Sequence, residues 1–229
     1  MNFIHTVKTK LFLGAFFAVI VLGGLSSCDS PPQYSDIPHI GLNRVSFVEG
    51  GGASVDKLVV DISFQDGNGD LGLADSDTLG PYKSYTPKLD ENGNVIKYGS
   101  RPGLPPLDLD ETTASLRNWF LVDGDTILHH INPHGNNFHL EIYTKENNEF
   151  KLFDFVSQGK RPIAGRFPIL FQKIGEPLEG DIVYTEESSS IGALFKTKIL
   201  KFKIYIYDRS LNKSNVLETS EFQLSDITK

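Results

Sequence analysis

The strongest constraint on the fold is a regular alternation of apolar and polar residues in two segments near opposite ends of the chain. In residues 57–64, large apolar residues occupy every second position from Leu58 to Phe64. The same alternation runs through residues 200–207, where lysines and tyrosines fill the other positions. A period of two is that of a strand with one buried face. Both segments are therefore predicted to be half-buried strands.

Shorter segments of the same kind, separated by turn residues, lie between these two strands and after them. The shorter candidate strands are 119–122, 126–131, 138–144, 150–156, 167–171, 181–185 and 220–224. No window of a dozen residues sustains helical periodicity with caps, and the best, 110–120, would make only a short helix. The sequence thus predicts an all-β fold, an antiparallel β-sandwich with the strand count of an immunoglobulin-like domain. A closed barrel is the alternative.

A long stretch containing prolines and tyrosines, residues 78–110, interrupts this strand pattern. It contains five prolines and a turn sequence at 90–94, so it is predicted to be a loop insertion. Long loops inside a compact domain are uncommon and are often functional, although a variable surface loop is the alternative. The candidate contact residues in this stretch are Tyr82, Tyr85, Tyr98 and Arg101.

The first 27 residues have the order of a secretory signal. Lys8 and Lys10 precede an apolar run at 11–22, and small residues follow it. A bilayer-spanning helix needs about 20 apolar residues, and this run is shorter. Residues 1–27 are therefore predicted to be a signal peptide.

Cys28 follows this segment directly, and the tetrapeptide Leu25-Ser26-Ser27-Cys28 resembles the bacterial lipobox. That resemblance implies a diacylglycerol on the Cys28 thiol and a mature chain that begins at this residue. Because the chain has one cysteine, no intramolecular disulfide can form, and lipidation accounts for the thiol. Two or more acyl chains anchor a protein stably, so the membrane is the expected partner. We expect 28–43 to be the lipidated cysteine and a spacer, and 44–229 a single β-sandwich domain.

The charge of the chain argues against nucleic acid as a partner. Removing residues 1–27 takes away two lysines and no acidic residue, which changes the formal net charge from −7 to −9. Such an acidic chain would be repelled by a phosphate backbone.

An acidic, glycine-rich segment follows the first predicted strand. Asp66, Asn68 and Asp70 stand at positions 1, 3 and 5 of a calcium loop, with Asp77 at position 12. Leu71 replaces the glycine required at position 6, so an EF-hand is excluded and a looser loop holding a structural calcium is predicted. The glycines also match a dinucleotide-binding spacing, but the acids would repel a pyrophosphate. The alternative is a turn whose Asp and Asn side chains bond to their own backbone.

Four of the six histidines fall within residues 129–139 and raise the question of a zinc or copper site. They are His129, His130, His134 and His139. Pro133 disrupts any helix that would align two of them, so polar residues around a hairpin are the alternative.

Motifs of catalysis are missing from the sequence. It has no G-x-S-x-G elbow, no H-E-x-x-H and no phosphate-binding lysine motif, so we expect no enzyme. The alternative is a lipid-anchored hydrolase that uses Asp and Glu pairs or a bound metal.

Two blocks of the mature chain carry a resemblance to uncharacterised outer-membrane lipoproteins of the Bacteroidota type. Residues 64–72 resemble their pattern F-x-D-G-D-G-D-L-G, and residues 208–215 resemble D-R-x-x-N-x-S-N. Asn68 departs from the first pattern and would leave a cation site one charge poorer. The second block also resembles the last hairpin of bacterial immunoglobulin-like domains, with Asp208 opening its turn. The resemblance implies an envelope location, and we expect a binding or accessory module for an envelope protein complex or a glycan.

Overall fold

The computed structural model describes residues 32–51, 54–97, 119–122, 125–155, 157–158, 160–170, 173–188 and 190–229. The chain divides into two compact units, Met1–Gln33 and Tyr34–Lys229. All the described strands belong to the second unit. Cys28, the predicted signal peptide 1–27, Tyr98, Arg101 and most of the predicted helix 110–120 lie outside the described residues. Within the described ranges, no helix has the length and apolar character needed to cross a membrane.

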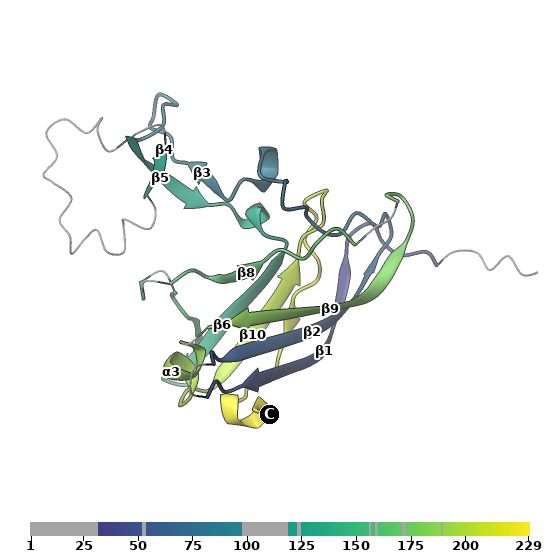
Figure 1. Ribbon diagram of the computed structural model, residues 1–229, viewed down its shortest axis with the longest axis vertical. Helices are drawn as coiled ribbons and strands as arrows, with labels where there is room; N and C mark the ends of the chain where they lie inside the picture. The colour runs from purple at the N-terminus through teal and green to yellow at the C-terminus, as the bar shows by residue number, and fades with distance from the viewer. Residues whose placement is uncertain are drawn as a thin grey trace, which may run out of the picture. The chain divides into compact units, whose positions relative to one another are not determined.

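Two antiparallel sheets form the body of the second unit (Figure 1). One sheet has the order β1-β2-β9, with β1 at His39–Val48, β2 at Lys57–Asp66 and β9 at Leu178–Glu187. The other has the order β11-β10-β6-β7, and β8 also pairs with β6. Its strands are β11 (Leu217–Glu218), β10 (Leu200–Ile206), β6 (Phe138–Glu146), β7 (Glu149–Leu152) and β8 (Ile163–Gly165). The predicted all-β, sandwich-like fold is confirmed, while its immunoglobulin-like character stays a prediction.

One hydrophobic core joins the inward faces of both sheets. The alternating apolar residues of β2 and β10 supply much of it, as their period predicts, and those of β10 are 0% exposed. Between the sheets, the Phe138 ring of β6 stacks on the Tyr184 ring of β9 with 4.2 Å between centroids. The core is thus continuous from one sheet to the other.

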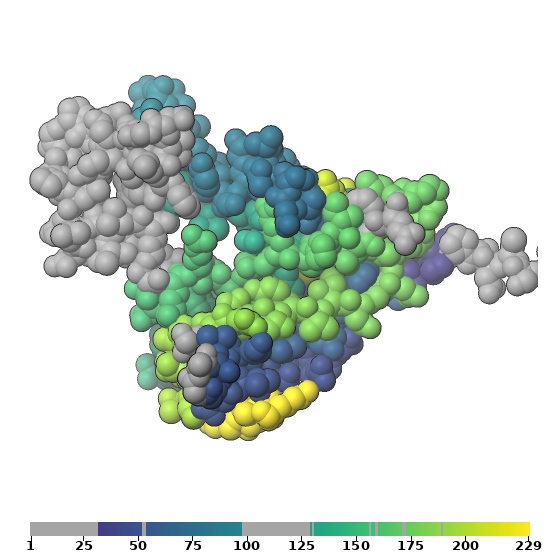
Figure 2. Space-filling view, viewed as in Figure 1, coloured from purple at the N-terminus to yellow at the C-terminus, as the bar shows by residue number. Residues whose placement is uncertain are grey.

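The free edge of β1 is covered by later parts of the chain. The Asn215 side chain accepts from the Ile40 N–H and donates to the Ile40 carbonyl. At the other end of β1, Phe47 bridges Thr228, and the C-terminal segment lies along this edge as a yellow band in Figure 2. The segment contains the 3-10 helix η5, Leu224–Ile227. Covering an edge in this way removes a site for pairing with another chain.

A third sheet, which we call the arm, has the order β3-β5-β4. Its strands are β3 (Tyr85–Pro87), β4 (Trp119–Val122) and β5 (Asp125–Ile131). The short 3-10 helices η1, Gly80–Tyr82, and η4, Pro133–Gly135, form its base. The predicted loop 78–110 is therefore not free of structure where it is described, because β3 pairs with β5 and Leu89 bridges Val95.

Three sequence predictions about elements were wrong. The predicted boundary at residue 44 falls inside β1, whose alternation is broken by a register shift between Leu42 and Arg44. The described part of 167–171 is not a strand, although β8 ends just before it. In 220–224, Phe222 makes only an isolated bridge to Leu200. A five-residue helix, α3 at Ile191–Phe195, precedes β10.

Candidate metal centre

Three buried aspartates meet where the end of β2 approaches the turn that follows β10. Asp66 is the last residue of β2, Asp70 lies in the loop after it, and Asp208 follows β10. One carboxylate oxygen of each lies within 4.8 Å of the other two. Their exposed fractions are 0%, 5% and 2% for Asp66, Asp70 and Asp208. The carboxylates are therefore a compact group shielded from solvent.

The loop after β2 folds back tightly enough to bring Asp70 beside Asp66. The Asp70 N–H donates to Oδ2 of Asp66 over 3.0 Å. Gly69 and Gly72 adopt positive φ angles of 62° and 103°, which side chains rarely tolerate. A Cβ at Gly72 would also come within 2.2 Å of the Pro168 carbonyl oxygen. Glycine is thus required here both by conformation and by space.

Asp208 reaches the group from a separate tight turn. Its Oδ1 accepts from the Asn212 N–H over 2.7 Å, and its Oδ2 accepts from the Asn212 side chain over 2.8 Å. The Ser210 hydroxyl of the same turn donates to Oδ2 of Asp70 over 2.7 Å. The turn after β10 is therefore bonded directly to the loop after β2.

Two oxygens of the group lack a hydrogen-bond partner. Oδ1 of Asp66 and Oδ1 of Asp70 are buried and accept no hydrogen bond. Among the ion pairs of the described residues, none involves Asp66, Asp70 or Asp208. Three uncompensated like charges in a buried site are strongly unfavourable. Such a group must either take up protons or hold a cation.

The donor set fits a hard divalent cation. All three ligands are carboxylate oxygens, which suit calcium or magnesium rather than zinc or copper. Two oxygens bound to one calcium at about 2.3–2.6 Å lie at most about 5 Å apart. The three carboxylate oxygens here lie within 4.8 Å of one another. Magnesium, at about 2.0–2.1 Å, would require the oxygens within about 4.2 Å and in near-octahedral geometry. The separations of these oxygens are thus within the range that calcium accepts, and its flexible coordination requires no single geometry.

Burial and neighbouring charges raise the pKa values of Asp66 and Asp208. Burial first, and then the charges of Asp70, Asp208 and Asp36, raise the pKa of Asp66 to about 7, against the hydrogen bond from the Asp70 N–H. Burial also raises the pKa of Asp208, against the hydrogen bonds from Asn212. In the metal-free protein, protonation of Asp66 therefore removes one of the negative charges that a bound cation would offset.

This shift predicts that the metal-free chain loses stability as the pH rises. An unfolded Asp has a pKa of about 3.9, whereas folded Asp66 titrates at about 7. Between these values the folded state binds more protons than the unfolded state, so its advantage is lost as pH rises through 7. We expect a lower urea midpoint at pH 8 than at pH 5 for chain stripped of metal, and a flatter profile for Asp66→Asn. A midpoint that is equal or higher at pH 8 would contradict this assignment.

The structure brings together two of the four residues predicted as calcium ligands and separates a third. Asp66 and Asp70 belong to the group, and the Asn68 amide oxygen accepts from the Asp70 N–H over 3.3 Å. Asp77 lies elsewhere: its Oδ2 accepts from the Arg209 guanidinium and from the Ala74 N–H. These donors lower the pKa of Asp77. Asp77 therefore lies outside the aspartate group of the structure and is bonded to Arg209.

Asp208 is the residue that the sequence prediction missed as a ligand. It had been interpreted as the opening residue of a turn, which it also is. The available signal was the pair of blocks at 64–72 and 208–215, because the structure places an aspartate of each block in the same group.

The histidine-rich segment does not form a metal site within the described residues. His134 lies against Tyr207 with 4.6 Å between ring centroids, and His139 stacks on Tyr205 at 5.0 Å. No histidine in the described ranges belongs to a group of three potential ligands. These rings are therefore part of aromatic packing around β6 and β10.

Comparisons of this chain with protein-family models, with characterised proteins and with solved structures found no match. The fold and the site define an all-β protein with a buried carboxylate group.

Proposed function

We propose that this chain is a calcium-stabilised binding module of the cell envelope, attached to the outer membrane by lipid on Cys28. The observation that supports it is the pair of buried, unpartnered oxygens of Asp66 and Asp70 beside the Asp208 carboxylate. A calcium ion would ligate both oxygens and offset the charge of all three side chains. The sequence 25–28 supports the anchor.

A binding role agrees better with this site than catalysis does. A hydrolytic metal needs an open position for water and substrate, whereas the three carboxylates here are at most 5% exposed. An ion in such a place serves stability. A lipid-anchored hydrolase using Asp and Glu or a bound metal is therefore the weaker alternative.

An envelope protein agrees better with the exposed residues than a glycan does. Leu79, Leu89 and Ile131, at or near the arm, are 74%, 57% and 48% exposed. Exposed aliphatic side chains of this kind suit contact with a protein surface. Contact residues are also commonly carried on loops and extensions of a rigid scaffold.

Calorimetric titration of the full-length chain in detergent with calcium chloride tests the proposal. We expect one calcium per chain, and binding weakened by at least about tenfold in Asp208→Asn, since ligand charge sets affinity in such sites. Asp181→Asn is the matched control, because Asp181 is an exposed carboxylate of β9 that bonds to Asn43. Absence of calcium binding, or equal loss in both variants, would overturn the proposal.

A further inference from the structure

The turn that supplies Asp208 also contacts the base of the arm through its next residue. Asp208 contributes a carboxylate to the candidate metal centre, and the Ser210 hydroxyl donates to Asp70. Between them, the Arg209 N–H donates to the Asp70 carbonyl over 3.2 Å. The backbone of this turn is therefore fixed on the side of the aspartates, and the Arg209 guanidinium also contacts the loop after β2 through the Gly72 carbonyl, which accepts over 3.4 Å.

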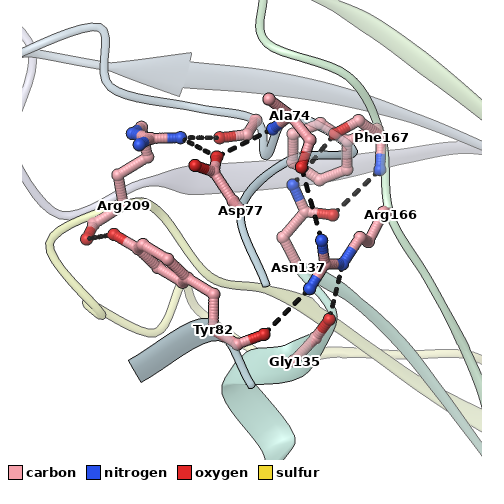
Figure 3. A network of polar contacts seen from close by, with 9 residues as sticks. Ala74, Asp77, Tyr82, Gly135, Asn137, Arg166, Phe167 and Arg209 are labelled. Atoms are coloured by element: carbon pink, nitrogen blue, oxygen red, sulfur yellow. Dashed lines mark hydrogen bonds and ion pairs between the residues drawn. The ribbon is translucent and has the colours of Figure 1, made fainter. Parts of the chain in front are cut away.

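Arg209 bonds to Asp77, which precedes the arm, and to Tyr82 at the base of the arm (Figure 3). Its guanidinium donates to Oδ2 of Asp77 over 2.5 Å, and its carbonyl accepts from the Tyr82 hydroxyl over 2.6 Å. The guanidinium also lies 5.5 Å from the centre of the Tyr82 ring. Asp77 raises the pKa of Arg209, so the pair stays fully charged. Tyr82 ends η1, and β3 begins shortly after it.

A second arginine holds the arm without contacting the metal centre. Arg166 donates to the carbonyls of Tyr82, Gly135 and Ala74 over 2.9, 2.7 and 3.3 Å (Figure 3). These bonds join η1 to η4. Among the described residues, the hydrogen bonds of the Arg166 side chain go to these three carbonyls and not to the aspartates or their turn. We therefore expect the contact of Arg166 with the arm to be independent of the cation.

We propose that cation binding at Asp66, Asp70 and Asp208 fastens the arm to the sandwich through Arg209. The inference rests on the proposed function, since it needs the site to bind a cation. With the ion present, the turn at 208–210 has one position, and Arg209 meets both Asp77 and Tyr82. Without it, repulsion among the carboxylates displaces the turn, and hydrogen bonds weaken steeply with such displacement. The arm base then opens more often.

Hydrogen–deuterium exchange of the full-length chain in detergent, with calcium or with EGTA, tests this coupling. Peptides from 79–97 and 125–135 report on the arm, and peptides from β6 and β10 report on the core. We expect arm exchange to be about tenfold faster in EGTA, the size expected when a charged hydrogen bond is lost, with a smaller change in the core. Equal arm exchange in the two conditions, in a chain that calorimetry shows to bind calcium, overturns the coupling and leaves the proposed function standing.

Two variants separate the coupling from general loosening. Asp77→Asn removes the ion pair outside the metal centre but leaves the Tyr82 hydroxyl bonded to the Arg209 carbonyl, so calcium affinity should stay within about threefold while the effect of calcium on arm exchange becomes smaller. Arg166→Gln is the control: arm exchange should rise in both conditions, and the difference caused by calcium should remain. A calcium effect of undiminished size in Asp77→Asn contradicts the role of the Arg209 guanidinium. Loss of calcium binding in the parent chain removes the proposed function and the coupling together.

Discussion

Calcium is expected to raise the melting temperature of the full-length chain by about 5–10 °C when its free concentration is a hundredfold above the dissociation constant. At that concentration, binding to the folded state alone contributes about 2.7 kcal/mol. In a domain of this size, each kcal/mol shifts the melting temperature by about 2–4 °C. The ion relieves the charge of Asp66, Asp70 and Asp208, which have no ion-pair partner among the described residues. Circular dichroism melts in calcium and in EGTA measure the shift.

Asp208→Asn should remove about half of this shift or more while raising the melting temperature in EGTA. The substitution takes away one ligand charge and also one source of repulsion in the empty site. Asp181→Asn, on the exposed face of β9, should leave both melts unchanged. Identical melts of the parent chain in calcium and in EGTA would rule out a stabilising ion.

Phe202→Ala is expected to lower the free energy of unfolding by about 3–5 kcal/mol, the range for truncating a buried phenylalanine. Phe202 is 0% exposed in the middle of β10. Its ring also meets the Phe222 ring edge-on, with 4.8 Å between centroids. The cavity left by the ring would lie between β10 and the segment before η5. Urea denaturation followed by circular dichroism gives the change.

Lys203→Ala provides the matched control on the next residue of the same strand. Lys203 points to the opposite face, where it lies over the Tyr143 ring and 3.6 Å from Glu218. Contacts of this exposed kind contribute about 1 kcal/mol or less. If Phe202→Ala cost no more than Lys203→Ala, the assignment of the β10 faces would be wrong.

The strands that could be predicted from sequence are those whose alternation is unbroken. β2 and β10 were predicted within two residues of their observed ends, because period two is a local property of the chain. β1 was missed because the register shift at Asn43, between Leu42 and Arg44, breaks the alternation of its apolar residues. β3 was missed because its pairing with β5 is a long-range contact, and Pro87 argues against a strand from sequence alone.

The same distinction between local patterns and long-range contacts applies to the candidate site. Asp66 and Asp70 are close in sequence, so a local motif was enough to propose them as ligands. Asp208 comes from the other sheet, and no spacing rule connects it to β2. Asp77 forms an ion pair with Arg209 instead. A pattern of oxygen ligands in the sequence does not predict such a long-range contact.

The most direct test of the central claim is a crystal structure of the protein grown with calcium, with anomalous data to locate the ion. We expect one anomalous peak at about 2.3–2.6 Å from a carboxylate oxygen of each of the three aspartates, including Oδ1 of Asp66 and of Asp70, the oxygens without partners. Crystals grown in calcium that show no peak there, with the Asp66 and Asp70 oxygens instead sharing a proton at close range, would contradict the account.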